Sequence, residues 1–409
     1  MGCGCGTVCG CEVADKKRLQ GKGRGFPRPF FYWLSIWQTG PFLQRDLSGR
    51  PPGPNADEAG EPPIEETQAS HTESAATTGV GFRAREPNKM TTEGTTDIER
   101  AVRLLGQDKL VAIPTETVYG LAGNAFSEKA VQEVYRLKNR PPVNPLIVHI
   151  KGTSALADIA RNIPDQAFAL AERFWPGPLT LVLDKQDHIS SSITASKSTV
   201  GVRVPNHSLT LELLNSLDFP LVAPSANRSN HISPTHPKHV RSSFGERTPF
   251  ILDGGACTSG IESTIIGLRS DGALLYRHGA ISREEIEDFL GCKLLESSNS
   301  VTPDSPGMFK KHYSPDTETR LTQDMLQDIQ ERPTANIGVI RFRNPLDQHD
   351  PSLQRVLSPS GNLAEAAANL YSSLHELDQL GLDLILVEEA PDTGLGMAIN
   401  DRLKRASYH

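Results

Sequence analysis

The chain lacks the features that would place it at once in a common class. No apolar stretch reaches the roughly 18 residues that a membrane-spanning helix needs, and the nearest, FFYWLSIW at Phe30 to Trp37, is too short. The formal net charge of -7 argues against general polyanion binding, since such affinity comes from Lys and Arg that neutralise phosphates. No phosphate-binding loop of the form G-x-x-x-x-G-K-S/T occurs. We therefore expect no membrane partner, and any nucleotide must be held by a local patch of side chains.

Cysteine is scarce, and its positions indicate neither a metal site nor a lipidation site. The repeated Cys-x-Cys near the start has no His partner and no flanking secondary structure, so we expect no metal site there. A lipidation signal is not supported either, because that pattern needs Ser or Thr where this chain has Gly6. The body of the protein is expected to be reduced and intracellular. The six cysteines are Cys3, Cys5, Cys9, Cys11, Cys257 and Cys292.

The region from residue 1 to 95 is predicted to be a disordered extension. The stretch from Arg50 to Gly79 is rich in Pro, Gly, Glu, Ser and Thr and has almost nothing to bury. An excess of basic residues in the first fifty weakly indicates organelle targeting. Two alternatives stay open: a cytoplasmic protein, or one sent to the mitochondrion by this extension. Met90 is an alternative start of a shorter protein.

The segment from Pro114 to Ile150 carries the densest set of chemically useful side chains. It follows the apolar run Leu110 to Ile113 and ends in a second one, Leu146 to Ile150. Both runs are typical of strands buried on both faces. We expect one helix between them, capped by Ser127 and ended by Pro141. Such a helix would deliver Lys138 and Arg140 at its exit. A Lys-x-Arg step can hold two neighbouring phosphates, or it can be a solvated helix end.

With these residues in place, the chain resembles the threonylcarbamoyl-adenylate synthases, whose catalytic domain has the YrdC-like fold. The resemblance extends over most of the chain and includes the longer, two-domain form of the family. Beyond the segment above it is carried by FWPGPLTLVL (174–183), VGVRVP (200–205), PLVAPSANRSNHISPT (220–235), ILDGG (251–255), GIESTII (260–266), LYRHGAIS (275–282), SPGMFKKHYSP (305–315) and GLGMAINDRLKRAS (394–407).

The residue pattern predicts an α/β protein. From Thr96 onward the strands outnumber the helices, which favours a twisted mixed sheet with helices packed on it. The resemblance implies the same: a YrdC-like domain whose sheet lines one large pocket. We expect a catalytic domain over residues 96–295, then a linker over 296–334 whose loop covers ATP, and a terminal module over 335–409.

The terminal module is predicted to be a small Rossmann-like unit. A β-α-β-α order follows from ANIGVIRF, a helix over Leu363 to Leu380, LILVEE and a helix over Leu395 to Ala406. Asn362 is the expected cap of the first helix, and Gly381 its stop. Because no G-x-G-x-x-G occurs here, dinucleotide binding is not expected. A regulatory or lid-positioning role fits better.

The resemblance also implies the site residues. It assigns catalysis to Lys138 and Arg140. It places these residues around ATP: Arg140, Asn144, Thr199, Ser225, Asn227, Ser233, Arg277 and Tyr313. It places these around L-threonine: Thr117, His149, Arg203, Ala223 and Ser263. For Arg203 the residues themselves add an argument, because a charge between Val202 and Val204 in an interior strand needs a carboxylate partner. That partner is the ligand or a protein Asp or Glu, and the sequence leaves both open.

The activity implied by the family joins L-threonine, bicarbonate and ATP into threonylcarbamoyl-AMP, with release of pyrophosphate. No nucleophilic side chain is required, so catalysis would rest on holding the reactants together and neutralising charge. Mg2+ is expected with the ATP phosphates, and no protein metal cage is expected. The product would pass to the machinery that makes N6-threonylcarbamoyladenosine in tRNA, with at most weak tRNA binding by this chain. A non-catalytic module that binds double-stranded RNA or tRNA is an alternative, and a carbamoyl-transfer domain is another.

Overall fold

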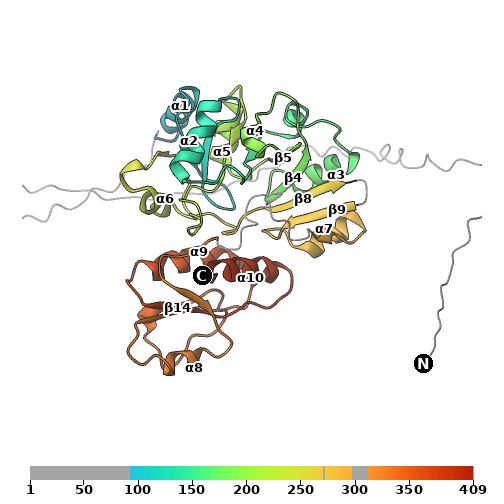
Figure 1. Cartoon of the computed structure of the whole chain (residues 1–409). Helices are drawn as coiled ribbons and strands as arrows, with labels where there is room; N and C mark the ends of the chain where they lie inside the picture. The colour runs from blue at the N-terminus through green and yellow to red at the C-terminus, as the bar shows by residue number, and fades with distance from the viewer. Residues whose placement is uncertain (1–92, 270–271, 297–311, 409) are drawn as a thin grey trace, which may run out of the picture. The chain divides into compact units, whose positions relative to one another are not determined.

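The computed structural model describes residues 93–269, 272–296 and 312–408 (Figure 1). The four N-terminal cysteines, Met90 and nearly all of the predicted extension lie outside these residues, as does the stretch 297–311 of the predicted linker. The first described element, α1 (Glu93–Gly106), begins before residue 96, so its first residues fall within the predicted extension. In the described part of the chain, no helix has the length and apolarity that a membrane crossing requires.

Residues 93–296, here called the ten-stranded region, form one mixed sheet with the strand order β10-β9-β8-β4-β5-β3-β6-β2-β1-β7. In its centre, β4 runs antiparallel to β5 and parallel to β8. The prediction of a mixed sheet with helices is confirmed. The strands are β1 (Val111–Ile113), β2 (Gly120–Asn124), β3 (Ile147–His149), β4 (Leu179–Asp184), β5 (Thr199–Arg203), β6 (Leu221–Val222), β7 (Phe250–Ile251), β8 (Thr264–Arg269), β9 (Gly272–Arg277) and β10 (Leu295–Glu296).

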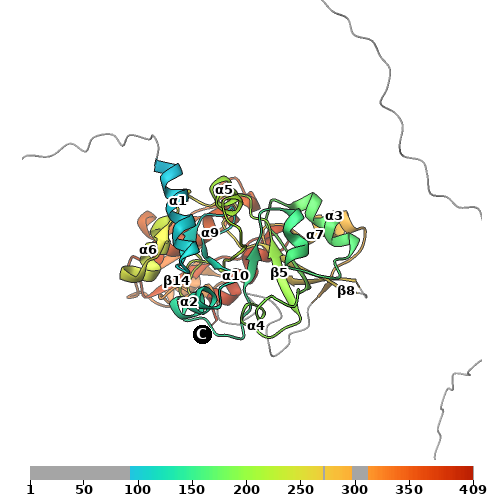
Figure 2. The same cartoon turned by 90° about the horizontal axis from the view of Figure 1, so that it is seen from above.

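Helices pack on this sheet through buried apolar faces. Side chains of α1 and α5 share one apolar cluster with β1. Helices α3 and α7 lie side by side (Figure 2), where the rings of Phe174 and Phe289 are 5.6 Å apart between centroids. The remaining helices of this region are α2 (Glu128–Lys138), α3 (Asp165–Phe174), α4 (Ser191–Thr194), α5 (Ser208–Asn215), α6 (Pro237–Phe244) and α7 (Arg283–Leu290).

The helix expected between the first two apolar runs is present as α2, but the prediction missed a strand. Strand β2 also lies there, pairs antiparallel with β1, and together with β6 separates β1 from β3 in the sheet. Its sequence GLAGN does not indicate a strand, because Gly weakens strands and has no side chain that could contribute to an alternating apolar pattern. The structure explains one of these glycines, since a Cβ at Gly120 would lie 3.1 Å from the Cβ of Ala223.

Helix α2 has the capping that the sequence indicated. The Ser127 hydroxyl accepts a hydrogen bond from the backbone N–H of Ala130, and Val131 and Val134 are fully buried. The helix ends at Lys138, where Asn139 adopts the left-handed conformation with φ 51°. Asn tolerates this conformation better than most residues, so the chain can turn sharply here. This turn directs the following residues back toward the sheet.

Residues 312–408, here called the four-stranded region, form a parallel sheet in the order β11-β14-β12-β13. The predicted helix cap is confirmed, because the Asn362 side chain accepts from the N–H groups of Ala364 and Glu365. The elements are β11 (Thr319–Leu321), α8 (Met325–Gln330), β12 (Ile337–Arg341), β13 (Gln354–Val356), α9 (Leu363–Asp378), β14 (Leu384–Val387) and α10 (Leu395–Ala406).

Two of these elements fall inside the predicted linker. Strand β11 pairs in parallel with β14, and α8 follows it, so this sheet begins before residue 335. Strand β11 is three residues long, which is too short to show a pattern by itself. The division of the chain into a catalytic domain, a linker and a terminal module stays a prediction.

The two regions share an apolar cluster. Val118 and Ile261 of the ten-stranded region belong to the same cluster as Tyr313, Tyr371 and Ile399 of the four-stranded region. This contact places α9 and α10 beside the strand ends that carry most of the predicted site.

Candidate active site

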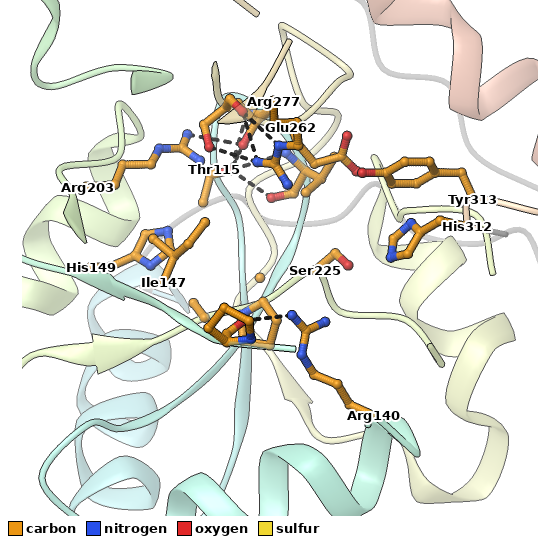
Figure 3. Close-up of a pocket in the computed structure, with 17 residues that line it drawn as sticks. Thr115, Arg140, Ile147, His149, Arg203, Ser225, Glu262, Arg277, His312 and Tyr313 are labelled. Atoms are coloured by element: carbon orange, nitrogen blue, oxygen red, sulfur yellow. Dashed lines mark hydrogen bonds between the residues drawn. The ribbon is translucent and has the colours of Figure 1, made fainter. Parts of the chain in front are cut away.

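A cavity lined mainly by the ten-stranded region encloses about 590 Å³ of empty volume, counting the space that is open to solvent. Figure 3 shows Arg203 and His149 at one end and His312 and Tyr313 at the other, with Arg140 and Arg277 on opposite sides between them. Many of the predicted site residues line it together: Thr117, Arg140, His149, Arg203, Ala223, Ser225, Ser263, Arg277 and Tyr313.

The fold collects these side chains because several lie at the ends of strands or helices. His149 and Arg203 are the last residues of β3 and β5, and the parallel pairing of these strands sets them opposite each other. Arg277 ends β9, and Arg140 follows α2. Segments that are far apart in the sequence thus meet at one point.

Arg203 already has a protein carboxylate. Its Nη2 lies 2.7 Å from Oε1 of Glu116, and both side chains are almost fully buried. Arg203 also donates to the Thr117 hydroxyl at 3.1 Å and to the Gly177 carbonyl at 3.2 Å. The partner that the sequence left open therefore includes a protein Glu, and Arg203 is held rigidly at the cavity wall.

His149 is neutral at physiological pH. Burial first, and the charge of Arg203 second, lower its pKa to about 3. Within the described structure its Nδ1 has no hydrogen-bond partner although the side chain is buried. A neutral imidazole beside a guanidinium group can exchange hydrogen bonds with a small polar ligand without adding charge.

Arg140 and Arg277 supply positive charge at the cavity. Burial lowers the pKa of Arg140 to about 10, which leaves it protonated at neutral pH, and burial also lowers the pKa of Arg277. Arg140 donates to the carbonyls of Asn144 and Pro145, while Arg277 donates to the Ser263 carbonyl. Both planar forks are oriented by neutral acceptors, which suits recognition of phosphate groups.

Lys138 does not line the cavity. Its ammonium group is buried and donates to the carbonyl of Ser225 at 2.5 Å and to that of Asn227 at 2.6 Å. Burial, and then the charge of Arg140, lower its pKa well below the usual value. In this structure Lys138 fixes the loop that presents Ser225 to the cavity.

The other predicted residues outside the cavity lining also have local partners. Asn144 accepts from Arg140 through its side-chain oxygen at 2.7 Å, and Ser233 donates to Glu262 at 2.7 Å. Asn227 donates to the carbonyls of Arg228 and His231. Thr199 begins β5 and lines a neighbouring hollow that shares Pro145 and Ile147 with the cavity. Each therefore supports or borders the cavity.

Tyr313 closes one end of the cavity. It is 1% exposed, has a positive φ of 62°, and its ring lies 4.0 Å from that of His312 between centroids. A positive φ is costly for a residue with a side chain, so surrounding contacts must hold Tyr313 in place. Burial, and then the charge of Glu262, raise the pKa of its hydroxyl.

Sequence reasoning missed Glu116, Glu262 and Arg402. Glu262 lines the cavity, and its carboxylate accepts from Tyr371 and from Arg402 of the four-stranded region. Burial alone would raise its pKa, but the charges of Arg402 and Arg277 lower it to about 2. Glu116 stands between two threonines in TET, and Glu262 is followed by Ser263 and Thr264 in EST. That polar setting beside buried strands was a signal that could have been followed.

Two family models match the chain, one after the other. The first, described as "Telomere recombination" for the Sua5, YciO and YrdC proteins, covers residues 103–279. The second, described as "Threonylcarbamoyl-AMP synthase, C-terminal domain", covers residues 281–407. The fold and the cavity thus define the two-part class of YrdC-like proteins.

Individual relatives agree with these models. The chain is 38% identical over 320 residues to the threonylcarbamoyl-AMP synthase of Bacillus subtilis, a match that covers 76% of this chain and 92% of that protein. Among solved structures it resembles Pyrococcus abyssi Sua5 complexed with L-threonine, with TM-score 0.70, 37% identity, and coverage of 76% of this chain and 94% of that one. A putative threonylcarbamoyl-AMP synthase of Mycobacterium tuberculosis matches over 194 residues at 32% identity, which is 47% of this chain and 89% of that protein. The chain belongs to the threonylcarbamoyl-AMP synthase family.

Proposed function

We propose that this chain makes L-threonylcarbamoyl-AMP from L-threonine, bicarbonate and ATP, releases pyrophosphate and water, and so supplies the tRNA modification N6-threonylcarbamoyladenosine. The observation that carries the proposal is the cavity itself, in which Arg140, Arg203 and Arg277 converge with hydroxyl groups from distant segments. An anionic amino acid and a triphosphate are the kind of ligands that such a set of donors would bind together.

L-threonine is assigned to the end of the cavity that holds Arg203 and His149 (Figure 3). The Arg203 guanidinium would meet the carboxylate of the substrate, with Glu116 fixing its orientation from behind. Thr117 and Ser263 offer hydroxyl groups near by, and neutral His149 would hydrogen-bond the threonine or its carbamate. Ala223 leaves room for the side chain of the ligand.

ATP is assigned to the part lined by Arg140, Ser225, Arg277 and Tyr313, with Thr199 at the neighbouring hollow. The deprotonated threonine amine would first combine with bicarbonate or CO2 to give a carbamate. An oxygen of the carbamate would then attack the α-phosphorus, and pyrophosphate would leave. Arg140 and Arg277 would neutralise the charge that grows on the leaving group, and no covalent bond to the protein forms.

Four of the predicted residues support the site without contacting the ligand in this proposal: Lys138, Asn144, Asn227 and Ser233. Lys138 would work by holding the loop of Ser225 and Asn227 rather than by touching a phosphate. Asn144 orients Arg140, and Ser233 donates to Glu262. This role differs from the direct phosphate contact that the resemblance implied for Lys138.

Mg2+ is proposed only as a companion of the ATP phosphates. Among the described residues that line the cavity, Glu262 alone carries a carboxylate. Its oxygens accept hydrogen bonds from Ser233, Tyr371 and Arg402, so they do not suit a metal ion. The described part of the chain holds no group of three or more His, Cys, Asp or Glu that could bind a metal.

The test is to incubate purified protein with ATP, bicarbonate and each amino acid in turn, and to measure pyrophosphate. We expect release that depends on L-threonine and on bicarbonate, and a product with the mass of threonylcarbamoyl-AMP. Tight, salt-sensitive binding of RNA with no pyrophosphate would instead favour a binding module. A cytoplasmic location, with mitochondrial targeting as the alternative, and delivery of the product to a tRNA-modifying partner also remain proposals.

A further inference from the structure

Arg402 is a fully buried cation that the ATP site as proposed above does not use. It lies on α10 of the four-stranded region, its side chain is 0% exposed, and its Nε donates to Oε2 of Glu262 at 3.0 Å. Its Nη1 donates to Asp401 at 2.8 Å, and its guanidinium carbon lies 5.2 Å from the centre of the Tyr313 ring. One side chain therefore contacts a carboxylate of the cavity wall and the residue that closes the cavity.

The negative charge of the Glu262 carboxylate is unfavourable in a site for a triphosphate, which is itself negatively charged. Glu262 lines the same cavity as Arg140 and Arg277. Burial raises its pKa, but the charges of Arg402 and Arg277 lower the pKa further and keep the carboxylate ionised. Inside a protein a unit charge acts over several ångströms with little screening, so an unneutralised Glu262 would repel phosphates or draw Arg277 away from them. Ser233 and Tyr371 donate hydrogen bonds to it but bring no charge.

The cavity contains a second Arg–Glu pair that shows the alternative arrangement. Arg203 faces the cavity while its Glu116 does not line it. In the pair with Glu262 the order is reversed, because Glu262 lines the cavity and Arg402 does not. Arg402 lies behind Glu262 and does not line the cavity, so it is not placed to bind the ligand directly.

We propose that Arg402 is a positioning residue for ATP: it neutralises Glu262 from the four-stranded region, keeps the phosphate end of the cavity positive, and supports the ring of Tyr313. The proposal rests on the assignment of ATP to this cavity. It gives the four-stranded region a specific task in nucleotide binding. One Nη2 atom of Arg402 is buried without a hydrogen-bond partner among the described residues, as expected of a group placed for charge and stacking.

The experiment compares four variants of the full-length protein: Arg402→Met, Arg402→Lys, Glu262→Gln and the double variant Arg402→Met/Glu262→Gln. The Kd of a non-hydrolysable ATP analogue is measured by calorimetry, and the KM values for ATP and L-threonine by pyrophosphate release. Arg355→Met is the matched control, since Arg355 pairs with Glu376 at 2.7 Å in the same region and neither residue lines the cavity.

Arg402→Met should weaken ATP binding about tenfold, while the KM for L-threonine stays within about twofold, because the negative charge of Glu262 is left unneutralised at the phosphate end of the cavity. Arg402→Lys keeps the charge and should stay within about threefold of the original protein. Glu262→Gln should tighten ATP binding about threefold, and the double variant should return it close to the original value. Arg355→Met should change neither.

A merely structural Arg402 would give another pattern. Equal losses for ATP and L-threonine in Arg402→Met, without rescue by Glu262→Gln, would overturn the proposal. If Arg402→Met does not fold, the Glu262→Gln variant tests the proposal. Unchanged or weaker ATP binding by Glu262→Gln would then contradict it. If the unmodified protein binds ATP but releases no pyrophosphate with L-threonine, the proposed reaction fails while the ATP-binding data still judge Arg402. Absence of ATP binding would overturn both.

Discussion

The two described regions differ in how they contribute to the same cavity. The ten-stranded region brings side chains to it from strand ends of a mixed sheet, so residues such as His149, Arg203 and Arg277 line the cavity directly. The four-stranded region is a regular parallel sheet whose helices place Tyr371 and Arg402 behind Glu262. The ten-stranded region therefore forms most of the cavity lining, whereas the four-stranded region supports one wall through Glu262.

The largest effect is expected inside the ten-stranded region, at Lys138. Lys138→Ala leaves the buried carbonyls of Ser225 and Asn227 without their donor, so the free energy of unfolding should fall by about 3 kcal/mol. Urea denaturation followed by circular dichroism measures it, with exposed Lys129→Ala as the control. A stable variant that loses only pyrophosphate release would instead make Lys138 a residue of the chemistry, as the sequence suggested.

Arg140 should show the opposite balance of stability and activity. Arg140→Ala should reduce kcat/KM for pyrophosphate release about 100-fold, because a preorganised donor for the leaving phosphates is lost. Arg140→Lys should recover little, since Lys lacks the planar fork. The control is Arg136→Ala, an exposed neighbour on α2 that pairs with Glu133. Activity within a few-fold of the original in Arg140→Ala would remove Arg140 from the phosphate site.

Acid should weaken both regions through histidines that are buried in the neutral form. Burial lowers the pKa of His149 to about 3 and that of His375 to about 4, below the ordinary value of about 6.5. The unfolded chain then binds protons that the folded chain does not, so stability present above pH 6.5 falls as the pH drops toward 4. We expect urea midpoints at pH 5 to lie below those at pH 7.

His375→Gln sharpens this test for the four-stranded region. It should reduce the loss of unfolding free energy between pH 7 and pH 5 by about 2 kcal/mol, because one such histidine is removed. His188→Gln, an edge-on neighbour of the exposed Phe126 ring, serves as the control. An unchanged pH dependence in His375→Gln would show that its folded and unfolded pKa values are similar.

The smallest effect is expected at Tyr371, where the four-stranded region meets the cavity wall. Tyr371→Phe removes the hydroxyl that donates to Glu262 at 3.0 Å but keeps the ring, so unfolding free energy should fall by about 1 kcal/mol. The KM for ATP should rise about twofold, since Arg402 still neutralises the carboxylate. Thermal denaturation and pyrophosphate kinetics measure the two values. A change larger than that of Arg402→Met would place the main support at Tyr371 instead.

Local patterns predicted the regular elements well. The Ser127 cap of α2, the Asn362 cap of α9 and the apolar runs that became β3 and β14 all appear in the structure. Each depends on neighbours within a few residues, which the sequence shows directly. Strand β2 was missed because its Gly120 is explained only by the close approach of Ala223, which is distant in the sequence.

The motifs of the family identified the residues of the cavity, and the sequence alone therefore determined the family and most of the site's chemical groups. Only the tertiary structure decided which of these groups face the cavity and which hold it together. The Lys138 ammonium group donates to two backbone carbonyls, and Arg203 pairs with Glu116. Glu262 pairs with Arg402, which is 140 positions away in the sequence. The physical reason is that a buried charge is stabilised by whichever opposite charge lies near it in space and is buried with it. Neither the distance nor the burial can be read from the order of residues.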